Sequence, residues 1–172
     1  MRMPGLKLLS ASLASIAAAC GGSSFQTQAP ADISGNYSVT LTNQANGCMF
    51  ANWTVGSSAQ DLHIAIQQQG ASASATVSGV AALVLDVILG TPTFQGAVQG
   101  ESFSLTAFGS NQGKDGMCTF TIKVTMAGSI DGDAIQGTLT YSETTNGSPA
   151  CDYHSTCTSV ETFAGVRPGD GG

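Results

Sequence analysis

Few side chains in this sequence have the types and spacing that catalysis requires. The two histidines are His63 and His154, and the sequence has no nucleophile-elbow, zinc-binding-helix or phosphate-loop motif. Asp152, His154 and Ser155 supply the three side-chain types of a Ser/His/Asp triad. Side chains this close together in one short loop cannot easily converge as the members of a triad do. We therefore expect a protein that is not an enzyme.

Cysteines are the other reactive side chains, and the sequence has five of them. Cys20 lies in the N-terminal segment, which leaves an even number for the rest of the chain, as exported proteins with disulfides usually have. These four can pair in three ways, and we favour a short Cys151–Cys157 loop with a long Cys48–Cys118 crosslink. No Cys-x-x-Cys pair is present, so we expect no metal site and no cofactor. Disulfides indicate an oxidising compartment.

Residues 1–19 have the pattern of a secretory signal peptide. Arg2 and Lys7 give the segment a positive start, and an uncharged, mostly apolar run follows from Leu8 to Ala19. This run is shorter than the roughly twenty apolar residues that a membrane-spanning helix needs. We expect the segment to be removed on export.

The end of this segment, from Ile16 to Cys20, resembles the lipobox of bacterial lipoproteins. The resemblance implies that Cys20 receives a diacylglycerol and becomes the N-terminus, with residues 20–31 as a flexible tether to the membrane. It also implies sorting to the outer membrane, because Gly21 rather than an aspartate follows the cysteine. Ala17 departs from the family pattern, which usually has leucine there. The alternative is ordinary cleavage after an Ala-x-Ala sequence, which leaves Cys20 as a thiol.

The composition limits the partners of the rest of the chain. Of the 172 residues, 9% are charged, with 11 acidic against 5 basic side chains and a formal charge of -6. No basic patch can neutralise a nucleic-acid backbone, so we expect no nucleic-acid partner. The length fits a single domain, which we place at residues 32–167, followed by a disordered tail at residues 168–172.

Apolar and polar residues alternate through most of the chain after residue 33, which is the pattern of half-buried β-strands. We predict an all-β fold in which an antiparallel up-and-down meander of about eight strands closes into a barrel, because closure removes exposed edges. A two-sheet β-sandwich is the alternative. The two-residue turn chemistry of β-hairpins occurs at Gln69–Gly70, Gln99–Gly100 and Asp131–Gly132.

The last predicted strand, at residues 158–166, can be oriented in two ways. One face carries Glu161 and Phe163, and the other carries Val160, Thr162, Ala164 and Val166. Alternation alone does not decide which of these faces points into the barrel.

Residues 80–89 interrupt the alternation with a nearly continuous apolar run between two glycines. We expect a short helix that plugs one mouth of the barrel. Leu83 and Val87 would then line an apolar cavity, and we name both as candidate ligand-binding residues. Alternatively, the helix contacts a membrane to which the lipid on Cys20 holds the protein. The residues that share the predicted apolar face are Val80, Leu83, Val84, Val87 and Ile88.

Two aromatic residues complete the candidate ligand-binding set. Trp53, the one tryptophan, lies in the predicted connection between the first two strands, where it can stack on a ligand or pack into the core. Tyr37 lies near the start of the first strand, two residues after Gly35, and Arg167 follows the last strand.

This arrangement resembles that of lipocalin-like (calycin) barrels, in which a Gly-x-Trp motif lies beneath an arginine or lysine from the final strand. Tyr37 stands where the family has tryptophan. The resemblance implies a barrel of the same strand order, with Tyr37 packed beneath Arg167.

Together these features favour a lipid-anchored, non-catalytic β-barrel of the outer membrane, facing the periplasm or the cell surface, that binds a small apolar ligand. The alternative is a surface module, built as a β-sandwich, that contacts a protein or a polysaccharide through its exterior of Thr, Ser and Gln. A hollow barrel interior would favour the first function. Exposed aromatic residues around Trp53 would favour the second. The sequence makes no prediction of oligomeric state.

Overall fold

The computed structural model of the chain describes residues 28–168. The predicted signal peptide, Cys20, most of the predicted tether and residues 169–172 of the predicted tail lie outside the described residues. Within residues 28–168, no helix is long and apolar enough to cross a membrane.

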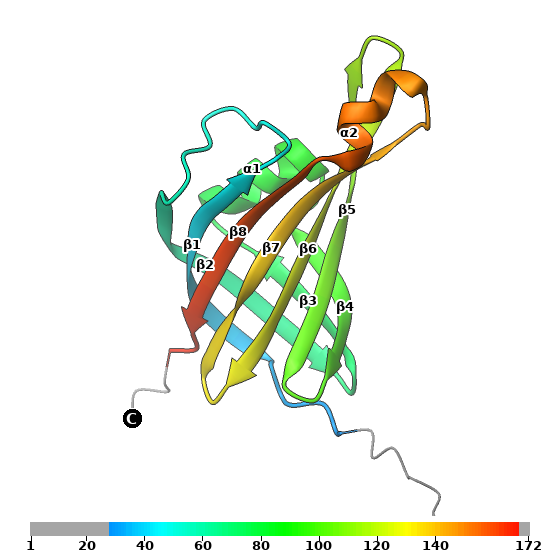
Figure 1. The fold of residues 1–172 in the computed structure, drawn as a ribbon. Coiled ribbons are helices and arrows are strands. Elements are labelled where there is room, and N and C mark those ends of the chain that lie inside the picture. The colour runs from blue at the N-terminus through cyan, green and yellow to red at the C-terminus, as the bar shows by residue number, and fades with distance from the viewer. Residues whose placement is uncertain (1–27, 169–172) are drawn as a thin grey trace, which may run out of the picture.

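Eight antiparallel strands form one closed barrel, in which each strand pairs with its neighbours in sequence and the first pairs with the last (Figure 1). The predicted up-and-down barrel is confirmed, and the β-sandwich alternative is wrong because Leu41 pairs directly with Phe163 across the closure. The strands are β1 (Gly35–Asn46), β2 (Ser58–Gln69), β3 (Ser72–Val77), β4 (Thr93–Gln99), β5 (Ser102–Asp115), β6 (Cys118–Asp131), β7 (Ala134–Thr145) and β8 (Thr158–Val166).

The alternation of the sequence decides which side chains fill the barrel. The predicted turns at Gly70, Gly100 and Gly132 are hairpin turns in the structure, each glycine has a positive φ, and a fourth hairpin turn at Gly116 joins β5 to β6. On β8, Glu161 and Phe163 point inward, so the face that carries the carboxyl group is the buried one. Phe163 decides this orientation, because an aromatic side chain gains more from burial than valine or threonine does.

The segment before β1 closes one end of the barrel. The N–H of Ala31 donates to the carbonyl of Gly100 in a hairpin turn, over 2.8 Å. The N–H of Ile33 donates to Oε1 of Gln68, also over 2.8 Å, and the Ile33 side chain is fully buried. The described N-terminus therefore lies at the closed end (Figure 1).

Tyr37 and Arg167 pack together at this closed end. The guanidinium carbon of Arg167 lies 5.6 Å from the centre of the Tyr37 ring, which is the packing that the lipocalin-like resemblance implies. Gly35 has a φ of 142°, and a Cβ at that position would lie 2.9 Å from Cδ of Arg167. A larger residue would therefore displace the arginine from the tyrosine ring.

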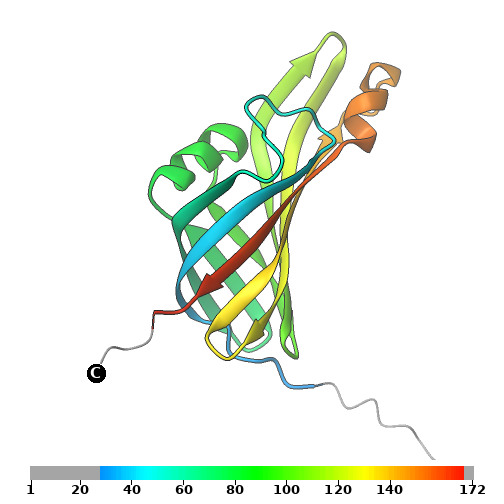
Figure 2. The same cartoon turned by 60° about the vertical axis from the view of Figure 1, so that its left-hand side comes forward.

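The helix α1 (Val80–Leu89) connects β3 to β4 and lies at the opposite end of the barrel from the N-terminal segment (Figures 1 and 2). It has the predicted position and length. Its C-terminal end is held by Asn111 of β5, whose Nδ2 donates to the carbonyls of Asp86 and Val87 over 3.1 and 2.9 Å. No side chain caps its N-terminal end at Gly79.

Two disulfides crosslink the same end of the molecule. Cys48 is bonded to Cys157, and Cys118 is bonded to Cys151. All four cysteines are therefore paired, as predicted, but the favoured pairs Cys151–Cys157 and Cys48–Cys118 are wrong. Two disulfides indicate a compartment outside the reducing cytoplasm.

Strand pairing explains the observed connectivity. Asn46 pairs with Ser159 across β1 and β8, which brings Cys48 beside Cys157. The connection from β7 to β8 folds into η1 (Pro149–Cys151) and α2 (Asp152–Thr156), and this turn of helix separates the two cysteines that a short loop would have joined.

Candidate functional site

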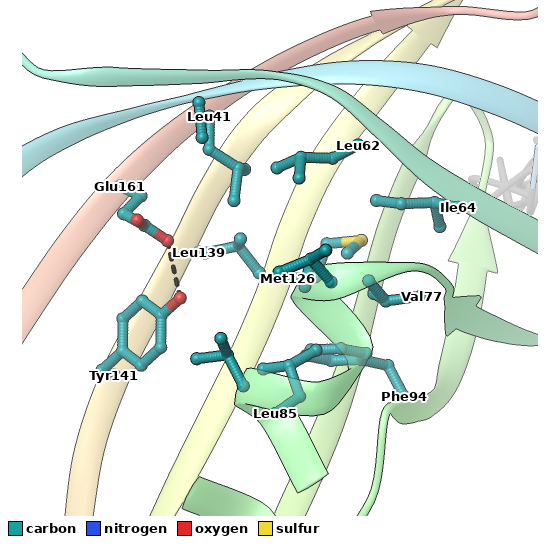
Figure 3. Close-up of a pocket in the computed structure, with 14 residues that line it drawn as sticks. Leu41, Leu62, Ile64, Val77, Leu85, Phe94, Met126, Leu139, Tyr141 and Glu161 are labelled. Carbon is teal, nitrogen blue, oxygen red and sulfur yellow. Dashed lines mark hydrogen bonds between the residues drawn. The ribbon is translucent and has the colours of Figure 1, made fainter. Parts of the chain in front are cut away.

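A cavity of about 310 Å³ lies in the half of the barrel that α1 covers. The opposite half contains closely packed buried side chains, among them Phe103 and Phe163, whose ring centres lie 6.2 Å apart. The volume is at the lower end of the range for small-molecule sites. Seven of the eight strands and α1 contribute the lining residues, which are Leu41, Ala59, Leu62, Ile64, Val77, Val80, Ala81, Val84, Leu85, Phe94, Met126, Leu139, Tyr141 and Glu161 (Figure 3).

Helix α1 turns only part of its predicted face to the cavity, since Val80 and Val84 line it. Ala81 and Leu85 line the cavity, whereas Leu83 and Val87 point away from it with exposed fractions of 64% and 77%. The prediction was wrong for Leu83 and Val87 because nearly every residue of the helix is apolar, so hydrophobic periodicity distinguishes the faces weakly. Asp86 was the informative residue, because the one charged side chain of the helix lies on its exposed side.

The two predicted aromatic ligand-binding residues also lie off the cavity. Tyr37 is buried at the closed end, where its hydroxyl donates to the carbonyl of Ile33 over 3.0 Å. Trp53 is half-buried and does not line the cavity, but it lies edge-on to Tyr141 with 5.8 Å between ring centres. Its indole N–H donates to the carbonyl of Gln44 over 3.2 Å. Trp53 thus positions a lining residue without lining the cavity itself.

The cavity has one polar end, formed by Tyr141 of β7 and Glu161 of β8. The Tyr141 hydroxyl donates to Oε2 of Glu161 over 2.6 Å (Figure 3). Burial raises the pKa of the Glu161 carboxyl, and the hydrogen bond from Tyr141 opposes this in part. Burial and then the charge of Glu161 raise the pKa of the Tyr141 hydroxyl, which keeps it a donor.

Sequence reasoning did not name Tyr141 or Glu161 as site residues. Tyr141 was recognisable as an inward residue of a predicted strand, but nothing distinguished it from a core tyrosine. Glu161 shared a face with Phe163, and the aromatic residue was the available sign that this face is buried. A carboxyl group on the inward face of a strand is the signal that could have identified the site.

Asp152, His154 and Ser155, which supply the side-chain types of a triad, do not form one in the structure. Nδ1 of His154 lies 2.5 Å from Oε2 of Glu143, and the imidazole ring stacks on Phe120 with 4.2 Å between centres. The Ser155 hydroxyl donates instead to the backbone carbonyl of Asp152 over 3.0 Å. Among residues 28–168, no hydrogen bond joins the side chain of His154 to that of Ser155 or Asp152.

One cluster has the side-chain types of a metal site. The ligand atoms of Cys48, Cys157 and Glu143 lie within 4.8 Å of one another. The two sulfur atoms are bonded to each other, so neither is a thiolate that could bind a metal. His63 is exposed on β2 and is not part of this cluster.

No family model and no curated protein matches this sequence. Among solved structures, the fold is similar to that of EF1p2_mFAP2b bound to DFHBI, with 15% sequence identity and a TM-score of 0.41. The similarity covers 78% of this chain and 92% of that one.

Proposed function

We propose that this protein is a lipid-anchored, non-catalytic barrel of the cell envelope that binds a small apolar ligand in the cavity beneath α1. The observation that carries the proposal is the division of the barrel interior, which is filled at one end and hollow at the other. A barrel whose only role is structural gains stability from a filled interior, because a cavity forfeits packing interactions.

The lining of the cavity favours an apolar ligand. Twelve of its fourteen residues are Ala, Val, Leu, Ile, Phe or Met, and the other two are Tyr141 and Glu161. An apolar ligand would cover this surface and gain roughly 25 cal/mol for each Å² removed from water.

A ligand would enter the cavity beside the N-terminal half of α1. The exposed residues of the lining are Ala59, Val80 and Val84, so the cavity opens between the start of β2 and the start of the helix. The end of α1 at this opening has no side-chain cap, whereas Asn111 holds the other end. The helix can therefore open the cavity by moving its N-terminal half away from the rim.

The lipobox resemblance, together with the position of the N-terminal segment, favours one orientation at the membrane. Gln28, the first described residue, lies eight positions after Cys20, and an extended chain of that length spans at most roughly 28 Å. A lipid on Cys20 would hold the closed end of the barrel toward the bilayer. The cavity and α1 would then face away from that bilayer, and α1 would not be the membrane contact considered above.

A fluorescence titration tests ligand binding. The apolar fluorophore N-phenyl-1-naphthylamine should bind the wild-type protein at one site per chain, with enhanced emission. Ala81→Phe places a ring in the cavity and should weaken binding at least tenfold, whereas Leu83→Phe changes the exposed face of the same helix and should leave it unchanged. No binding to the wild type, or loss of binding only in L83F, would contradict a ligand site inside the barrel.

Intact mass spectrometry of detergent-extracted protein tests the anchor. The proposal requires a chain that begins at Cys20 and carries added acyl groups. Replacing Cys20 with serine should release the protein from the membrane fraction while leaving the two disulfides in place. An unacylated mature chain would overturn the lipid anchor without affecting the proposal of a ligand site.

A further inference from the structure

The cavity is polar at one side only. Glu161 and Tyr141 lie at one side of it, and Phe94 and Val77 lie at the other (Figure 3). Glu161 is 9% exposed, although it is a carboxyl group on the inward face of a strand. A ligand in this cavity would therefore meet an apolar wall along its body and a single acidic group at one end.

Glu161 retains an unused acceptor. Tyr141 occupies Oε2, and no residue between 28 and 168 donates a hydrogen bond to Oε1. The cationic side chains in that range, Lys114, Lys123 and Arg167, do not line the cavity. Burying a carboxylate without a cation is costly, so such groups are usually paired. The barrel itself supplies no partner of opposite charge for Glu161.

We propose that the ligand supplies this partner: the cavity selects a small amphiphile whose apolar body lies among the aliphatic side chains and whose protonated amine pairs with Oε1 of Glu161. The inference rests on the proposed function, because it assigns the ligand class of the same cavity. Tyr141 is a positioning residue, since its hydrogen bond holds Oε2 and leaves Oε1 to the ligand. Trp53 packs edge-on against the Tyr141 ring.

Electrostatics distinguishes an amine from other head groups of similar size. A protonated amine and a carboxylate attract strongly where water is excluded, and the hydrogen bond between them is charge-assisted. An alcohol would gain only a hydrogen bond to the same oxygen. A carboxylate ligand would be repelled by Glu161 whenever both groups are ionised.

Three probes with the same ten-carbon chain test the inference: decylamine, decanol and decanoate. Isothermal titration calorimetry near pH 7.5 should show decylamine binding to the wild type at least tenfold more tightly than decanol, and decanoate binding most weakly. In Glu161→Gln, the preference for the amine over the alcohol should fall to about threefold or less, with the affinity for decanol nearly unchanged. Glu101→Gln removes the same formal charge at an exposed site and should keep the wild-type preference.

The outcomes separate this inference from the proposed function. If the wild type binds decanol as tightly as decylamine, or if E161Q keeps the amine preference, the amine assignment is wrong while the apolar ligand site stands. If none of the three probes and no apolar fluorophore binds the wild type, the proposed function fails and the inference fails with it. Circular dichroism of each variant shows whether the barrel has folded.

Discussion

The hydroxyl of Tyr141 donates a hydrogen bond of 2.6 Å to Oε2 of Glu161 within the wall of the cavity. Burial raises the pKa of this carboxyl group, so the folded protein holds its proton more tightly than the unfolded chain does. Unfolding then releases a proton at any pH between the two pKa values. The stability that the protonated carboxyl contributes is complete below the ordinary glutamate pKa of about 4.3 and is lost as the pH rises through the raised value.

Glu161→Gln should therefore stabilise the empty protein at high pH. Glutamine still accepts the hydrogen bond from Tyr141 but does not ionise, and near pH 8 we expect a gain of about 1 kcal/mol in the free energy of unfolding. The gain should shrink toward about pH 4, where the wild-type carboxyl is protonated in both states. Urea unfolding at the two pH values measures it, with Glu101→Gln as the control at an exposed site. A gain that is the same at both pH values would contradict the raised pKa.

Asn111→Ala should loosen the helix that covers the cavity. The variant loses the two hydrogen bonds from Asn111 to the carbonyls of Asp86 and Val87, each worth about 1 kcal/mol. We expect a bound fluorophore to dissociate about fivefold faster or more in stopped-flow measurements, with faster hydrogen exchange in α1. Ser110→Ala removes a single bond to the carbonyl of Leu89 and should have a smaller effect. An unchanged dissociation rate in N111A would show that the Asn111 anchor at the C-terminal end of α1 does not limit ligand release.

Much of the fold could be predicted from local sequence, because strands and hairpin turns are local features. The alternation of apolar and polar residues located the strands, and the short turn at Gly132 and Asp133 set the register of the hairpin in which Asp131 pairs with Ala134. The run at residues 80–89 identified α1, since its apolar content and flanking glycines are visible without any tertiary contact. The hydrogen bonds between β1 and β8 join residues more than a hundred positions apart, so closure could only be inferred from the cost of exposed edges.

The site was harder to predict, because it depends on which face of an element meets which neighbour. Leu83 and Val87 belong to the helix that covers the cavity but lie on its outer side. Trp53 was named as a candidate because it is the one tryptophan, but its contact with Tyr141 joins two segments that are far apart in the sequence. The predicted disulfide pairs were wrong for the same reason, since the partner of Cys157 is set by strand pairing and not by distance along the chain.

Removing the disulfides in pairs should destabilise the protein to different extents. The Cys48–Cys157 bond joins residues 109 positions apart, and the Cys118–Cys151 bond joins residues 33 apart. Chain entropy predicts a loss of about 5 kcal/mol for the first pair and about 4 kcal/mol for the second when both cysteines are replaced by alanine. Urea unfolding measures the order of the two losses. Non-reducing peptide mapping checks the connectivity, and a peptide that links Cys151 to Cys157 would contradict the structure.

Replacing Arg167 tests whether the closed end of the barrel acts independently of the cavity. The arginine lies over the Tyr37 ring, and its Nε lies 3.4 Å from Oδ1 of Asp133. Arg167→Ala loses the cation–π contact and the packing of the side-chain stem, for which we expect a loss of about 1 kcal/mol in stability. Arg167→Lys keeps the charge and should lose less, although lysine lacks the planar group that stacks on a ring.

Ligand binding should not follow this loss of stability. The cavity lies in the half of the barrel that α1 covers, and neither Tyr37 nor Arg167 lines it. The affinity of R167A for N-phenyl-1-naphthylamine should therefore stay within about twofold of the wild type at temperatures where the variant is folded. A large drop in affinity would mean that the two ends of the barrel are coupled, because neither residue lines the cavity itself.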